Sequence, residues 1–123
     1  MPLCLAAGAV AATLAVESFT LGWTHSIEKL RWEEDWRVAG TSLVLDEARV
    51  RGSGAGMEPP PGAVFERGAW RYRPALPPQA VVRLTHSPHA AGYAICAPDC
   101  QPLADHLSGI ENTAVIEIRS CPP

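Results

Sequence analysis

Hydrophobic and polar residues alternate with a period of two along much of the chain, which is typical of strands that bury one face. The alternation is clearest over Phe19–Ile27 and resumes over Trp32–Val38. It predicts two strands joined near Glu28–Leu30. In the first strand, one face collects the apolar and aromatic residues: Phe19, Leu21, Trp23, His25 and Ile27.

A carboxylate falls on the aromatic face of the second strand. Glu34 shares that face with Trp32 and Trp36, while Glu33 and Asp35 fall on the opposite face. A carboxylate beside two indoles must find a donor, remain hydrated at a rim, or serve in binding. The pattern therefore marks Glu34 as a candidate functional residue.

Shorter alternating runs follow, separated by Gly and Pro. A turn at Ala39–Thr41 predicts a hairpin with a strand over Ser42–Arg51, in which Leu43 and Leu45 face one side and Ala48 faces the other. Further strands are expected over residues 64–72 with a turn at 66–68, and over 80–85, 92–97, 101–103 and 115–119, with one helical turn at 103–107. The fold class indicated is all-β, an antiparallel β-sandwich or a partly open barrel.

The composition fits one small folded domain. The chain has 123 residues, of which 47% are hydrophobic and 19% charged, a balance that excludes general disorder. Its formal net charge of −3 disfavours a nucleic-acid partner, which needs clustered Lys and Arg. We expect no cofactor, because the glycines near residue 54 lack the Lys-Ser or Lys-Thr of a phosphate-binding loop.

The start of the chain resembles an export signal. Pro2–Val16 is apolar and uncharged, too short for a spanning helix but long enough for a signal-peptide core. We expect a signal peptide over residues 1–16 and one β-rich domain over 17–123, with membrane contact only if the segment is not cleaved. No Lys or Arg precedes the run, so a buried first strand or an uncleaved anchor stays open as the alternative.

Cysteine usage supports a periplasmic or secreted location. Cys96 and Cys100 flank a turn-forming triplet, so a tight hairpin is expected to join them in a disulfide. If Cys4 leaves with the signal, Cys121 is left over as a free or an intermolecular thiol.

Three strings carry a family resemblance: FTLGWTHSIEK over Phe19–Lys29, WEE over Trp32–Glu34, and GSGAGM over Gly52–Met57. They resemble the bacterial domain-of-unknown-function family 1850, over nearly the whole chain after its apolar start. The resemblance implies a small exported protein with no established activity. It also implies an association with TRAP-type tripartite transporters of the TAXI branch, which move carboxylate-bearing solutes.

The glycine-rich stretch is a candidate anion site. Arg49 and Arg51 share a strand face just before Gly52–Gly56. Successive backbone N–H groups in such a turn form a concave anion site, and a neighbouring guanidinium grips a carboxylate with two parallel bonds. The alternative is that the glycines only permit a sharp crossing or a bulge.

Catalytic and metal-binding interpretations are weaker. His25 and Ser26 point to opposite faces of a strand, so a hydrolase would need Ser53 to fold back over His25. The spacing of His25 with Glu28, or of His86 with His89, matches no known metal motif. We therefore assign no catalytic residue and no metal ligand.

The leading hypothesis is an exported, non-enzymatic accessory or binding module whose partner is a transporter component or a small carboxylate. Its alternatives are a small hydrolase built on His25 and Ser53, and a purely structural periplasmic domain. The indoles either form an interaction surface or fill the core. The candidate binding residues are Trp23, His25, Glu28, Lys29, Trp32, Glu33, Glu34, Arg51, Gly52, Ser53, Gly54, Gly56 and Met57.

Overall fold

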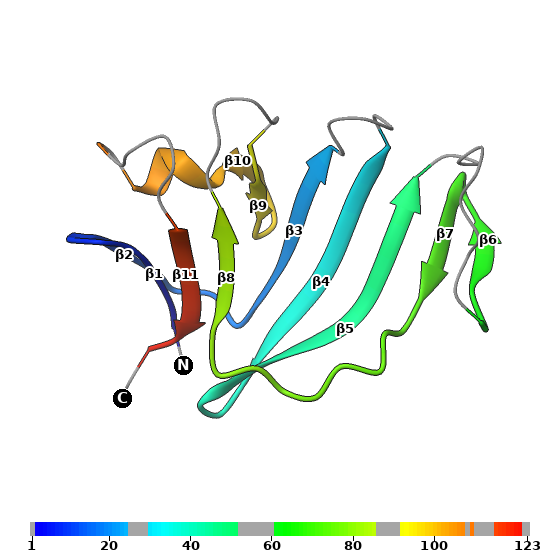
Figure 1. Ribbon diagram of the computed structural model, residues 1–123, viewed down its shortest axis with the longest axis horizontal. Helices are drawn as coiled ribbons and strands as arrows, with labels where there is room; N and C mark the ends of the chain where they lie inside the picture. Colours follow the sequence, from blue (N-terminus) through cyan, green and yellow to red (C-terminus); the bar gives the residue numbers. More distant parts are fainter. Residues whose placement is uncertain are drawn as a thin grey trace.

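The computed structural model describes residues 2–24, 30–51, 61–85, 92–107, 109 and 115–121. These residues form two antiparallel sheets that do not close into a barrel (Figure 1). The all-β class predicted from the alternation is therefore confirmed. Within the described ranges, the helical structure is one 3-10 turn, Leu103–His106, at the predicted helical turn. In that part of the chain, no helix is long and apolar enough to cross a membrane.

The larger sheet has the strand order β10-β9-β3-β4-β5-β7-β6. Its centre is the Trp-rich hairpin and the strand that follows it, as the alternation predicted. The β6–β7 hairpin turns at Arg67 and Gly68, whose φ angles of 54° and 78° suit a tight two-residue turn. The seven strands are β3 (Ser18–Thr24), β4 (Arg31–Ala39), β5 (Ser42–Arg51), β6 (Val64–Glu66), β7 (Ala69–Tyr72), β9 (Ala94–Cys96) and β10 (Cys100–Pro102).

The smaller sheet has the order β2-β1-β11-β8. It brings the two ends of the described chain together, because β1 and β11 are neighbouring antiparallel strands. Figure 1 places this sheet at one end of the molecule and β5, β7 and β6 at the other. Its strands are β1 (Leu3–Ala7), β2 (Val10–Leu14), β8 (Val82–Thr85) and β11 (Val115–Ser120).

The hydrophobic core lies where the two sheets meet. The smaller sheet contributes Leu3, Leu5, Ile116 and Ile118, all fully or almost fully buried. The part of the larger sheet nearest to them contributes Phe19, Leu21, Trp36, Leu43, Leu45 and Ile95. Burial of side chains of this size is the main stabilising contribution to such a fold. The larger sheet extends beyond this core by several strands.

One expected facing is wrong. The alternation placed Ala48 on the face opposite Leu45, but both face inward, and Ala48 is only 3% exposed. The reason is a β-bulge: Asp35 pairs with Glu47 while the next residue, Trp36, pairs with Leu45. Asp46 is the extra residue, and it inverts the facing of everything after it in β5.

The apolar start of the chain is part of the fold. Leu3 and Leu5 of β1 are fully buried, and β1 pairs with β2 on one side and β11 on the other. This arrangement is the buried first strand that the sequence left open beside the export signal. Cleavage of a signal at residue 16 stays a prediction, and in this fold it would remove a central strand of the smaller sheet.

Both pairs of cysteines form disulfides. The predicted Cys96–Cys100 bond is present across the β9–β10 hairpin. Cys121, which was expected to be left over if Cys4 leaves with the signal, is bonded to Cys4 with the two Cα atoms 5.1 Å apart. The pairing of β1 with β11 brings these two distant residues together. Two disulfides are typical of proteins in an oxidising compartment.

Replacing Cys4 and Cys121 together by Ser is predicted to destabilise the protein much more than replacing Cys96 and Cys100. The first disulfide spans 117 residues and the second spans 4. The chain-entropy relation assigns about 5 kcal/mol to the longer loop and about 2 kcal/mol to the shorter one. Urea unfolding of the two double variants measures the difference, and equal losses would contradict this assignment.

Candidate functional site

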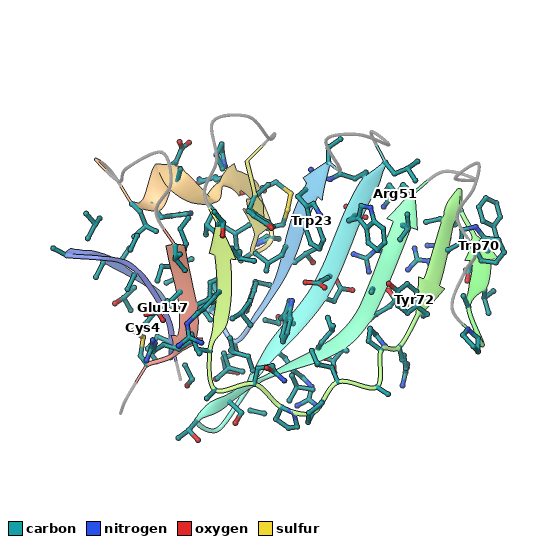
Figure 2. The ribbon with its side chains drawn as sticks, viewed as in Figure 1. Cys4, Trp23, Arg51, Trp70, Tyr72 and Glu117 are labelled. Atoms are coloured by element: carbon teal, nitrogen blue, oxygen red, sulfur yellow. A yellow bond between two sulfur atoms is a disulfide. The ribbon has the colours of Figure 1, made fainter. Side chains whose placement is uncertain are left out.

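Aromatic side chains cross the inner face of the larger sheet in one row. Residues directly opposite each other on neighbouring strands point to the same face, so the register places the row on five strands in succession. Figure 2 shows Trp23 on β3 and Trp70 on β7, well separated along the sheet. The row is Trp23, Trp32, Val50, Trp70 and Phe65.

The rings of this row form two contacting groups. Trp23 stacks on Trp32 with centroids 6.3 Å apart and also contacts Tyr93 at 5.5 Å. At the other end, Phe65 meets Trp70 edge-on at 5.2 Å. Val50, which is 1% exposed, lies between Trp32 and Trp70. Val50 therefore separates two groups of rings, all half-buried except Phe65, which is 49% exposed.

The four indoles divide between the core and this outlying face. Trp36 belongs to the core cluster, and Trp23 is a partly buried residue that packs against this cluster. Trp32 and Trp70 are half-buried but are not members of the core cluster. The expectation that the indoles fill the core therefore holds for Trp36 and not for the outer two. We call the region formed by Trp23, Trp32, Glu34, Tyr72, Tyr93 and Trp70 the aromatic face.

Glu34 occupies the next row of the same face. It pairs with Leu21 on one side and with Ala48 on the other, and Tyr72 follows beyond Ala48. The Nε1–H of Trp36 donates a hydrogen bond of 3.1 Å to Glu34 Oε1. Among the described residues, no arginine or lysine pairs with this carboxylate.

Burial sets the protonation behaviour of this group. Removal from water raises the pKa of Glu34 above its ordinary value, and the hydrogen bond from Trp36 opposes the rise without cancelling it. Burial also raises the pKa of Tyr72 and of Tyr93, and the negative charge of Glu34 adds to the rise at both. The two phenols therefore lie within electrostatic reach of the same carboxylate.

Trp32 contributes an unused donor. Its Nε1 atom is buried and has no hydrogen-bond partner. A buried N–H without an acceptor costs free energy that a suitable ligand oxygen would recover. Within the described ranges, the aromatic face thus combines a carboxylate without a paired cation and a buried donor without an acceptor.

On the outer face of the same strands, by contrast, each central carboxylate forms an ion pair with an arginine. Arg49 binds Asp35 with two parallel hydrogen bonds of 2.6 and 2.8 Å and also contacts Glu47 at 2.6 Å. Arg51 pairs with Glu33 at 2.8 Å. The hydrogen bonds from Arg49 lower the pKa of Asp35, chiefly by stabilising its ionised form.

These pairs bear directly on the proposed anion site. Arg49 and Arg51 do share a face, as the sequence indicated, but carboxylates of the chain already engage both guanidinium groups. Arg51 ends β5 and lies opposite Arg31, which in turn lies opposite Thr24. Thr24, Arg31 and Arg51 therefore lie at the same end of three neighbouring strands. The described chain is interrupted at this end twice, between Thr24 and Leu30 and again after Arg51.

Five of the thirteen candidate binding residues lie in the described part of the chain. Trp23, Trp32 and Glu34 come together on the aromatic face, while Glu33 and Arg51 lie on the outer face. The sheet therefore divides these candidates between its two sides. The remaining candidates lie outside the described residues: His25, Glu28, Lys29, Gly52, Ser53, Gly54, Gly56 and Met57.

A comparison with known families agrees with the resemblance seen in the sequence. A model described as "Domain of unknown function (DUF1850)" matches residues 19–103. The chain belongs to this family. No curated protein and no solved structure matches.

The DUF1850 match covers all six residues of the aromatic face, which lie on β3, β4, β7 and just before β9. Sequence reasoning missed Trp70, Tyr72 and Tyr93 as parts of the site. The shared facing of Trp70 and Tyr72 was readable from the period of two, but their neighbourhood to Glu34 depends on strand order. Tyr93 reaches the face because β9 pairs with β3 across a long gap in sequence.

Glu34→Gln and Asp35→Asn are predicted to change stability with opposite pH dependence. The native state binds the Glu34 proton more tightly than the unfolded chain does. Its contribution to stability is therefore present below the ordinary pKa of 4.5 and is lost as pH rises through the higher folded value. Relative to the parent protein, Glu34→Gln should therefore become more stable as the pH rises from about 4 to about 7.

Asp35→Asn should do the reverse, because the native state favours the ionised form of Asp35. Its cost should be greatest at neutral pH, about 1–2 kcal/mol after allowance for its partial exposure. That cost should shrink as pH falls below 3.8, the ordinary pKa of Asp35. Urea unfolding across this pH range measures both, and parallel pH profiles would contradict the assignment.

Proposed function

We propose that this DUF1850 chain is an exported, non-enzymatic binding module whose contact site is the aromatic face. The observation that carries the proposal is the position of Trp32 and Trp70, which are half-buried beyond the core cluster. Aromatic anchors placed around a polar group are typical of protein-binding hot spots. Such rings contribute little to packing between the two sheets.

The compartment and the partner follow from separate observations. The two disulfides favour a periplasmic or secreted location. Family resemblance adds the association with TAXI-type carboxylate transport, so a component of such a transporter is the partner we propose. Contact through the aromatic face would suit an accessory role, since no reaction is required of the residues on it.

Replacing Trp32 by Ala is predicted to weaken partner capture by about 30-fold or more, the effect of losing one hot-spot residue. The immobilised protein is exposed to a periplasmic extract, and captured transporter components are quantified by mass spectrometry. Arg37→Ala is the matched control, because Arg37 makes an exposed ion pair with Asp46 on the outer face. Circular dichroism establishes that both variants fold.

The proposal requires that a transporter component be captured by the parent protein and by Arg37→Ala, and lost with Trp32→Ala. Absence of any transporter component from the parent capture would overturn the proposed partner. Equal capture by all three proteins would instead overturn the assignment of the contact site.

A further inference from the structure

Glu34 differs from the other carboxylates of the central strands. Its sequence neighbours Glu33 and Asp35 face outward, and each is paired with an arginine. Glu34 faces inward, where its only hydrogen bond from the described residues comes from Trp36. A partly buried carboxylate without a counter-charge is unfavourable. The described residues supply this carboxylate with a neutral donor, Trp36, and with no cation.

Aromatic rings lie near this carboxylate along its own strand and beyond its two cross-strand neighbours, Leu21 and Ala48. Trp32 and Trp36 flank it along β4, at the spacing of every second residue in a strand. Tyr72 lies across β5, and Tyr93 lies on the other side beyond β3. The faces of such rings carry negative potential and attract organic cations, most strongly where water is displaced.

We propose that the aromatic face binds a small organic ammonium ion, with Glu34 as its counter-charge and the rings of Trp32, Tyr72 and Tyr93 around it. The proposal rests on the proposed binding function and specifies the chemistry of the occupant. It differs from the small carboxylate expected from the sequence, because the negative charge of Glu34 would repel an anion.

The unused donor of Trp32 adds a second requirement. Its buried Nε1–H lacks an acceptor, and a hydroxyl or carboxyl oxygen close to the ammonium group would supply one. An amino alcohol or a zwitterion has both a cationic group for the rings and an oxygen that accepts from Trp32. A simple alkali cation neither packs against the aromatic rings nor offers this donor an acceptor. Choline is a suitable probe, since it carries a trimethylammonium group and a hydroxyl.

The test is a titration of the intact protein with choline, followed by the indole N–H resonances in heteronuclear NMR. The matched ligand control is the uncharged isostere of choline, in which a tert-butyl group replaces trimethylammonium. Acetate is the anionic control. We expect saturable shifts of the Trp32 resonance with choline, and at least about tenfold weaker binding of the isostere and of acetate.

Two variants assign the counter-charge. Glu34→Gln keeps the shape of the side chain and should weaken choline binding at least about tenfold, the effect of losing one charge-assisted interaction. Glu66→Gln makes the same change of charge at an exposed position of the same sheet and should leave binding unchanged. Tyr72→Leu, which removes one ring, should weaken choline and leave the isostere nearly unaffected.

The inference is overturned if choline binds no better than its isostere, or if Glu34→Gln binds choline as well as the parent protein does. Its failure is distinguishable from failure of the proposed function. Capture of a transporter component that depends on Trp32 but not on Glu34 would sustain the function and refute the cation. Choline binding that depends on Glu34, without any captured transporter component, would sustain the cation site and refute the proposed partner.

Discussion

The register between β4 and β5 determines what each face of the larger sheet can do. A shift of one residue in a strand moves every side chain to the other face, and the bulge at Asp46 makes that shift within β5. Beyond the bulge, Glu47, Arg49 and Arg51 face outward, and Ala48 and Val50 face inward. The double hydrogen bond between Arg49 and Asp35 holds this register, since it forms only when both residues share a face.

The same register leaves Glu34 without a charged partner among the residues that the structure describes. If β5 alternated without interruption, Arg49 would lie on the inner face, within reach of Glu34, and the outer carboxylates would lack their arginine. The observed arrangement instead collects the arginines of β5 on one side. It places the small residue Ala48 beside Glu34, with Leu21 on the other side, where an uninterrupted strand would have brought a guanidinium group near.

The two sheets also differ in size, and this difference leaves part of the larger sheet uncovered. Four strands cover only the part of the seven-stranded sheet that carries Phe19, Leu21 and Trp36. Strands β7 and β6 and the far end of β5 extend beyond them (Figure 1), and Trp70 and Phe65 there contact each other instead of joining the core. The disulfide between Cys4 and Cys121 links β1 to the end of β11 in the smaller sheet. The aromatic face begins at the edge of the core, where Trp23 and Tyr93 pack against it.

Much of the fold was readable from the sequence, because alternation with a period of two is a local property. It predicted strands over Phe19–Ile27 and Ser42–Arg51 and the facing of Glu34 between two indoles; the structure describes the first as Ser18–Thr24 and the second as Ser42–Arg51. It could not give the bulge at Asp46, which depends on the pairing of two strands. The Cys4–Cys121 bond and the approach of Tyr93 to Glu34 depend on strand order, which no local pattern encodes.

The most direct test of this account is the pKa of the Glu34 carboxyl, measured by NMR of its side-chain carbon with and without saturating choline. Desolvation without a counter-charge places the midpoint above the ordinary 4.5, and a bound ammonium group should lower it, because a nearby cation favours the ionised form. A midpoint at or below 4.5 that choline does not move would contradict the account.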